Sequence, residues 1–142
     1  MKIYIVIPAH NEEEHIAKTL ESLVNQQLKP AQVIVVNDNS TDRTAAVAND
    51  FIQHHHWINL IHKKSSDEHL PGAKIIAAFY EGYEVLDEDY DIICKFDADI
   101  VFEKNYLYQL SQYFKENDRL GMVAGQCYIQ KNDRWVLENL SK

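Results

Sequence analysis

The stretch IYIVIPAHNEE, residues 3–13, contains the pattern on which the fold is built. Its first five residues form a continuous apolar run rich in β-branched side chains, as expected of a strand that is covered on both faces. Pro8 ends that run, and Asn11 with Glu14 three residues later matches a helix N-terminal capping box. Apolar residues then recur at helical spacing over residues 16–28. A buried strand followed by an amphipathic helix is therefore the first unit of the chain.

Apolar runs and helical periodicities alternate along the rest of the chain. Strands are predicted at four further apolar runs, which are residues 33–36, 58–61, 91–96 and 121–124. Helical spacing predicts helices between them, one opened by Pro71-Gly72 and one beginning near Lys104. The helix after Gly72 is expected to bury its apolar residues Ile76, Phe79, Tyr80 and Tyr83. The alternation predicts an α/β fold with a mainly parallel sheet and helices on both faces, formed by residues 1–142 as a single domain.

The composition narrows the class of protein. The 142 residues carry a net charge of −8, which argues against nucleic acid as a partner. No signal peptide is recognised, and no apolar run approaches the ~18 residues of a membrane span, so a cytoplasmic location is expected. Cys94 and Cys127 show no metal-ligand spacing and are expected to be reduced. The run His54-His55-His56 is expected to be a solvated helix end, because consecutive helical residues point in different directions.

Polar clusters follow the first, second and fourth predicted strands, at residues 8–12, at residues 37–40, and at Asp97 and Asp99. In parallel α/β sheets, ligands bind at the carboxyl ends of the strands, so these clusters are expected to converge on one rim. Carboxylates together with phosphate oxygens suit Mg²⁺ or Mn²⁺, which makes the aspartate pair a candidate metal site; a solvated turn is the alternative. Neither a Gly-x-Gly-x-x-Gly fingerprint nor a Walker loop occurs.

Three stretches together resemble the signature blocks of family 2 glycosyltransferases of the GT-A fold. They are IVIPAHNEE at residues 5–13, VVNDNSTD at residues 35–42 and FDAD at residues 96–99. Their order and spacing also match, and the resemblance covers residues 2 to about 125. It implies a Rossmann-like GT-A fold and a metal-dependent transfer, with inversion, of a sugar from a UDP- or GDP-sugar donor to an acceptor hydroxyl. Mn²⁺ or Mg²⁺ is the implied cofactor.

The resemblance also implies roles for individual residues of the first two blocks. Pro8, Ala9 and Glu12 would line the nucleotide site, and Asp38 would accept a hydrogen bond from the base. His10 lies in the same block, so we expect it to contact the nucleotide, with a turn residue as the alternative.

The third block and the segment before it supply the remaining candidates. Asp99 would be the direct metal ligand, and Asp97 would lie near the ribose or the water shell of the metal. Ala98 between them is expected to belong to the same nucleotide-sugar site. Lys74, near the start of a predicted helix, could reach a phosphate or could be a solvated helix lysine.

Two departures from the family pattern occur in the second block, which usually reads Asp-Asp-Gly-Ser. Asn37 stands where the first aspartate is usual and removes one charge. Asn39 stands where glycine is usual, and asparagine can adopt the left-handed conformation that glycine would supply.

A larger departure concerns the acceptor half of the family. No stretch after Gly125 matches the block that carries the catalytic base of inverting enzymes; Asp133 and Glu138 are available acids, but neither is assigned that role. The chain is therefore expected to be truncated before the acceptor half, and no catalytic residue is predicted. A non-catalytic module that binds a nucleoside diphosphate and a metal is the alternative function, and a receiver-like signalling domain is a remote one.

Expected partners of a complete protein are a saccharide or lipid-linked acceptor in cell-envelope polysaccharide biosynthesis. Peripheral association with the inner membrane surface would occur through the missing C-terminal part.

Overall fold

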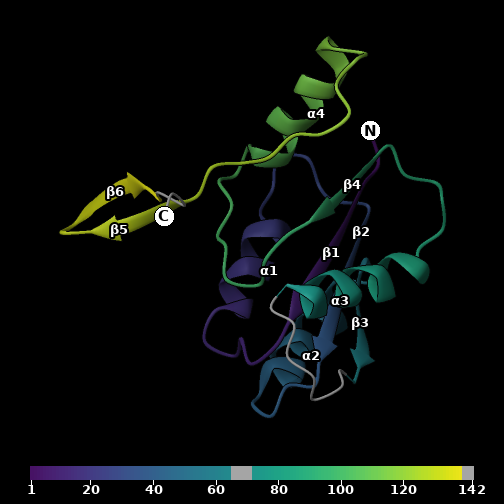
Figure 1. Cartoon of the computed structure of the whole chain (residues 1–142), viewed down its shortest axis with the longest axis vertical. Coiled ribbons are helices and arrows are strands. Elements are labelled where there is room, and N and C mark those ends of the chain that lie inside the picture. Colours follow the sequence, from purple (N-terminus) through teal and green to yellow (C-terminus); the bar gives the residue numbers. More distant parts are fainter. Residues whose placement is uncertain (65–71, 139–142) are drawn as a thin grey trace.

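The computed structural model describes residues 1–64 and 72–138, and within them a parallel sheet forms the centre of the molecule (Figure 1). Its strands are β1 (Ile3–Ala9), β2 (Gln32–Asp38), β3 (Ile58–Lys63) and β4 (Ile92–Lys95), in the order β3-β2-β1-β4. All three pairings are parallel, with Ile5 opposite Val33 and Cys94. The predicted parallel α/β sheet is therefore confirmed, although β1 continues through Pro8 instead of ending there.

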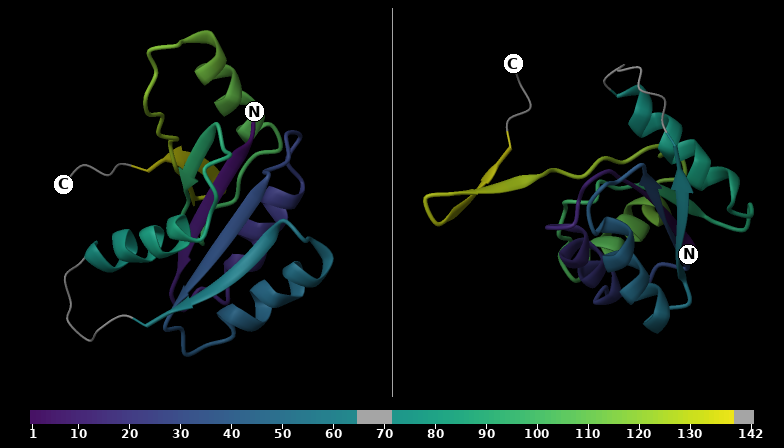
Figure 2. Two further views of the ribbon diagram at one scale, coloured as in Figure 1. Left: turned by 90° about the vertical axis from the view of Figure 1, so that its right-hand side faces the viewer. Right: turned by 90° about the horizontal axis from the view of Figure 1, so that it is seen from below.

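Helices cover both faces of this sheet, as the sequence predicts (Figure 2). The helices are α1 (Ile16–Val24), α2 (Thr44–His54), α3 (Ala73–Glu84) and α4 (Tyr106–Glu116). On one face, β-strand residues such as Ile5 and Val33 join side chains of α1, α2 and α4 in the main core. On the other face, Val6 and Val36 pack against Ala78 of α3. Strand residues alternate between these two cores, which is why the strands are apolar on both sides.

Helix α3 packs on the sheet through its small residues, so the predicted burial of Ile76 and Tyr80 is wrong. Their exposed fractions are 56% and 55%, whereas Ala78 and Gly82 are buried. A Cβ atom at Gly82 would lie 2.5 Å from a methyl group of Val6. The glycine therefore allows an approach to the sheet that a larger side chain would block, and the larger apolar residues turn outward.

The start of α1 also differs from the prediction. Asn11 has a φ of 51° and lies in a left-handed turn, so the expected capping box with Glu14 is wrong. The helix begins at Ile16 and ends at Val24, earlier than the apolar periodicity suggests. Leu28 lies beyond the helix but still packs against the main core.

The predicted strand at residues 121–124 is wrong as well. This segment is irregular, and Val123 packs against the main core without joining a sheet. Four apolar residues do not make a strand unless a neighbouring strand edge pairs with them.

The chain instead forms a separate antiparallel hairpin from β5 (Tyr128–Lys131) and β6 (Arg134–Leu137), which projects from the body (Figures 1 and 2). Its two turn residues, Asn132 and Asp133, have φ values of 49° and 61°, as in a type I′ turn. Trp135 is 70% exposed on this hairpin. Within the described ranges, no helix has the length and apolar character needed to cross a bilayer.

Candidate functional site

A cavity of about 520 Å³ opens at the carboxyl ends of β1, β2 and β4 and at the start of α3. Its lining includes all nine residues that the sequence proposes for the site, which are Pro8, Ala9, His10, Glu12, Asp38, Lys74, Asp97, Ala98 and Asp99. The volume lies within the range of small-molecule sites in proteins. The geometry thus brings these residues together, and their individual ligand contacts remain predictions.

The first segment of the rim follows β1. Ala9, the last residue of β1, is buried, and Glu12 is half-buried in the turn before α1. The Glu12 carbonyl accepts hydrogen bonds from the N–H groups of His15 and Ile16 at 3.0 and 2.9 Å, which ties it to the start of the helix. A carboxylate oxygen of Glu12 lies 3.2 Å from Nδ1 of His15.

The second segment is the end of β2 and the turn after it. Asp38 is buried, and its carbonyl lies 2.7 Å from Nδ1 of His10. Because a carbonyl oxygen only accepts, we assign the hydrogen to Nδ1, which leaves Nε2 of His10 as the acceptor. Asn37 is also buried and contacts His62 on β3 at 3.0 Å through its amide nitrogen. Asn39 has a φ of 56°, which confirms the left-handed conformation expected where the family usually has glycine.

The loops after β1 and β2 are joined by hydrogen bonds that run in both directions. The amide of Thr41 donates to Oδ1 of Asn11 at 2.8 Å, and the amide of Asn11 donates to Oγ of Ser40 at 3.0 Å. The amide of Glu12 donates to Oγ1 of Thr44 at 2.8 Å. The left-handed turn at Asn11 therefore places its side chain on the neighbouring loop, where it cannot cap α1.

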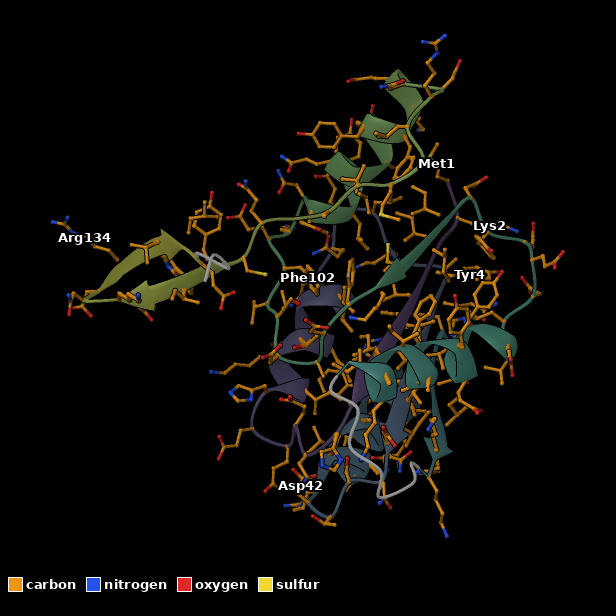
Figure 3. All side chains as sticks on the ribbon, in the orientation of Figure 1. Met1, Lys2, Tyr4, Asp42, Phe102 and Arg134 are labelled. Atoms are coloured by element: carbon orange, nitrogen blue, oxygen red, sulfur yellow. The ribbon has the colours of Figure 1, made fainter. Side chains whose placement is uncertain are left out.

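Asp42 supplies a further link between the same two loops. Its carboxylate accepts from the amide of Glu13 at 3.2 Å and from the amide of Thr44 at 2.9 Å (Figure 3). Burial acts to raise the pKa of Asp42, but the hydrogen bonds from Thr44 and Glu13 outweigh it and hold the pKa below the usual value. The rim carrying Glu12 and Asp38 is thus braced by charge-assisted as well as neutral hydrogen bonds.

The third segment follows β4. Asp97 and Asp99 are exposed, and Ala98 between them is buried. Oδ1 of Asp97 lies 2.9 Å from Nζ of Lys95, the last residue of β4. Asp99 lines the cavity, as does Lys74, which is half-buried in the first turn of α3. The lining of the cavity therefore includes both acidic groups and a cation at a helix start.

The donor atoms suit a cation that binds together with a phosphate ligand. Among residues 1–64 and 72–138, no group of three or more His, Cys, Asp or Glu side chains could hold a metal ion. Mg²⁺ commonly uses only one or two carboxylates, with waters and substrate phosphates completing its shell. Asp97 and Asp99 fit that arrangement and do not form a complete protein cage.

Comparison with known proteins identifies the family of this chain. The model of the family described as Glycosyl transferase family 2 matches residues 4–141. This chain belongs to glycosyl transferase family 2. Its curated relatives include "Probable glycosyltransferase YdaM" of Bacillus subtilis (strain 168), 34% identical over 130 residues, which cover 90% of this chain and 30% of the relative. The "Poly-beta-1,6-N-acetyl-D-glucosamine synthase" of Staphylococcus epidermidis is 28% identical over 90% of this chain and 29% of its own length.

Solved structures share the fold of this family 2 chain. The crystal structure of S. aureus TarS matches with a TM-score of 0.63 and 23% identity over 82% of this chain and 20% of that chain. The mannosyltransferase PcManGT from Pyrobaculum calidifontis matches with a TM-score of 0.60 and 19% identity over 80% of this chain and 32% of that chain. This chain therefore spans about a third or less of the length of these relatives.

Three cavity residues of this family 2 chain were not among the predicted ones: Asn39, Ile75 and Ala78. Ala78 follows Lys74 by four residues on α3, so helical spacing places both on one face. The sequence therefore holds a signal for Ala78, because the residue lies about one helical turn after Lys74. Asn39 is predicted as a left-handed turn residue, and that prediction alone does not place it in the cavity.

Proposed function

We propose that the cavity binds the nucleoside diphosphate part of a nucleotide sugar and that the protein transfers the sugar to an acceptor hydroxyl. The observation that carries this proposal is that the segments after β1, β2 and β4 line a single cavity in a chain of glycosyl transferase family 2. Solved structures of proteins with this fold add support. TarS 1-349 is described in complex with UDP-GlcNAc, and PcManGT in complex with GDP-Man and Mn²⁺. UDP and GDP are therefore the first nucleotides to test.

The chemistry of the lining suggests how the nucleotide would be held. Asp38 is a buried acceptor and would take a hydrogen bond from an N–H group of the base. Lys74 lies in the first turn of α3, where its ammonium and the positive end of the helix dipole would both attract a phosphate. Pro8, Ala9, His10 and Ala98 would form the wall between these ends, as lining residues only.

We further propose Mg²⁺ or Mn²⁺ as the cofactor, with Asp99 as a direct ligand and Asp97 as a second ligand or a partner of the water shell. Both carboxylates are exposed to the cavity, and the net charge of −8 makes a cation useful for holding an anionic diphosphate. The bound cation would stabilise the negative charge that develops on the departing diphosphate. Asp97 would have to exchange its contact with Lys95 for this role.

The proposed reaction is a single displacement with inversion at the sugar. The acceptor oxygen forms a bond to the anomeric carbon, the bond from that carbon to the diphosphate breaks, and a base takes the hydroxyl proton. None of the residues that line the cavity is assigned as that base. The synthase relative from S. epidermidis is named for a polysaccharide product, which supports a saccharide or lipid-linked acceptor.

A donor-binding module without catalysis is the second candidate. It is favoured by one observation, namely that none of the described residues lining the cavity is assigned as the base that the transfer needs. Both candidates share the nucleotide site, and they differ in turnover.

Two measurements separate the candidates. Calorimetric titration of the wild type with UDP and with GDP, in Mn²⁺ and then with a chelator, tests the shared site. Release of nucleoside diphosphate from UDP- and GDP-sugars, with and without saccharide acceptors, tests the chemistry. Metal-dependent binding with release supports the transferase, and binding without release supports the module. If neither nucleotide binds in Mn²⁺, both candidates are wrong.

A further inference from the structure

Helix α1 and the turn after it carry three buried polar side chains among their apolar ones. Thr19, Ser22 and Gln26 have exposed fractions of 0%, 9% and 1%. Their spacing of three and four residues places them on one side of the helical path. Buried polar groups are costly unless they are hydrogen-bonded, so their partners indicate what they do.

All three side chains bond to the backbone of residues 98–103, in the segment 96–105 that joins β4 to α4. Oγ1 of Thr19 donates to the carbonyl of Ala98 at 2.8 Å, and Oγ of Ser22 accepts from the amide of Phe102 at 3.1 Å. The side-chain amide of Gln26 donates to the carbonyl of Glu103 at 2.7 Å. Residues 96–105 form neither helix nor strand, so side chains of α1 provide the partners that regular structure would supply elsewhere.

The bond from Thr19 reaches the peptide between the two carboxylates of the cavity. Ala98 is buried, with an exposed fraction of 3%, whereas Asp97 and Asp99 on either side are exposed. The middle residue is therefore the anchored part of this turn, held by its methyl group in the core and by its carbonyl on Thr19. Because the position of Ala98 is fixed, the backbone positions of Asp97 and Asp99 on either side of it are fixed as well.

We propose that Thr19 is a positioning residue for the cation and diphosphate end of the site. The inference rests on the proposed function, because it concerns how Asp97 and Asp99 are presented to a metal-bound diphosphate. Thr19 is not among the residues that line the cavity, so it acts through Ala98 and not by contact with ligand. Divalent cations require oxygens at set distances and angles, and groups behind the ligands supply that order.

The part of the cavity proposed to bind the nucleobase is held in place by different hydrogen bonds. Asp38 and Glu12 are braced by the hydrogen bonds between the loops after β1 and β2, none of which involves Thr19. Loss of the Thr19 hydroxyl should therefore weaken the metal-dependent part of nucleotide binding and spare the rest. A general loss of stability would not separate the two parts in this way.

The experiment measures the affinity for UDP and for GDP in Mn²⁺ and in chelator. For each variant and nucleotide, the ratio of the affinity in Mn²⁺ to the affinity in chelator gives the metal-dependent part of binding. Thr19→Val removes the hydroxyl and keeps the shape, and we expect it to lower the ratio about fivefold, as for one lost hydrogen bond. Thr19→Ser keeps the hydroxyl and should retain the wild-type ratio. Ser111→Ala is the matched control, because Ser111 is buried in α4 and its hydroxyl donates to the Tyr108 carbonyl at 2.7 Å. It should also retain the ratio.

The outcomes distinguish this inference from the proposed function. A wild-type protein that binds neither nucleotide in Mn²⁺ contradicts the proposed function and the inference with it. A wild-type protein with metal-dependent binding and a Thr19→Val variant of equal ratio overturns the inference alone. So does a Thr19→Ser variant that loses as much as Thr19→Val. If Thr19→Val does not fold, Thr19→Ala is the second variant without the hydroxyl. A wild-type ratio in Thr19→Ala would also overturn the inference.

Discussion

Replacing Gln26 by methionine should remove one of the links between the turn after α1 and the start of α4. Its side-chain nitrogen donates to the carbonyls of Ser22 and Glu103 at 3.0 and 2.7 Å, and its oxygen accepts from the amide of Leu107 at 2.9 Å. Leu107 is the second residue of α4, and the helix has no side-chain cap of its own at Asn105. Gln26 therefore caps α4 from the turn that follows α1.

The size of the expected loss in the free energy of unfolding follows from the polar group that Gln26→Met leaves without a partner. Methionine fills a similar volume, so the change creates little empty space. The Leu107 amide loses its partner, whereas the Glu103 carbonyl keeps the hydrogen bond from the amide of Tyr106. The bond to the Leu107 amide is also the N-terminal cap of α4, so its loss is counted once, at about 1–3 kcal/mol for a buried polar group without a partner. The added apolar contact of the methionine offsets part of this cost. We expect the free energy of unfolding to fall by about 1–3 kcal/mol.

Urea unfolding followed by circular dichroism measures this change. Gln27→Met is the matched control, because the neighbouring glutamine is exposed and bonds to Lys104 only through its backbone amide. The control should lie within about 0.5 kcal/mol of the wild type, as is usual for surface substitutions. A Gln26→Met variant as stable as this control would refute the assignment of Gln26 as a link between the turn after α1 and the start of α4.

Three further predictions concern charge and protonation. Lys95→Gln removes the ammonium that competes for a cavity carboxylate, so Mn²⁺-dependent nucleotide affinity should rise about two- to threefold, as for an exposed ion pair, and weaker binding in calorimetry would contradict this. Burial raises the pKa of Cys94 to about 12, so a thiol reagent at about pH 8 should modify exposed Cys127 first and Cys94 only after denaturation; equal rates for both thiols would be the opposite result. The hydrogen bond to Asp87, with burial, raises the pKa of Tyr4 from 10.0 to about 12, so its contribution to stability is complete below pH 10 and lost as the pH rises toward 12. Urea midpoints should decline more steeply over this pH range for the wild type than for Tyr4→Phe, and equal declines would contradict the assignment.

The sheet and the position of the site could be predicted from sequence because both depend on repeated local signals. Apolar runs such as residues 3–7 and 33–36 mark strands buried on both faces, and the polar residues that follow them must meet at one edge of a parallel sheet. Among the polar residues at that edge, the carboxylates of Asp97 and Asp99 and the ammonium of Lys74 are the groups whose charge suits a metal-bound diphosphate.

The parts that could not be predicted depend on contacts between distant segments. Asn11 has the sequence of a helix cap, but a partner on the neighbouring loop takes its side chain. The inner face of α3 is decided by Gly82, whose lack of a Cβ matters only because β1 lies against it. Thr19 and Gln26 read as ordinary polar helix residues until the backbone that they bind is placed beside them.

The most direct test of the central claim is calorimetric titration of Asp99→Asn with UDP and GDP in Mn²⁺. The variant keeps the size of the side chain and removes the charge that a cation needs. Asp118→Asn is the control, since Asp118 is exposed after α4 and does not line the cavity. We predict that Asp99→Asn loses the affinity gained from Mn²⁺ and that Asp118→Asn keeps it. Equal Mn²⁺-dependent binding by Asp99→Asn and the wild type would contradict the claim that this cavity is a metal-dependent nucleotide site.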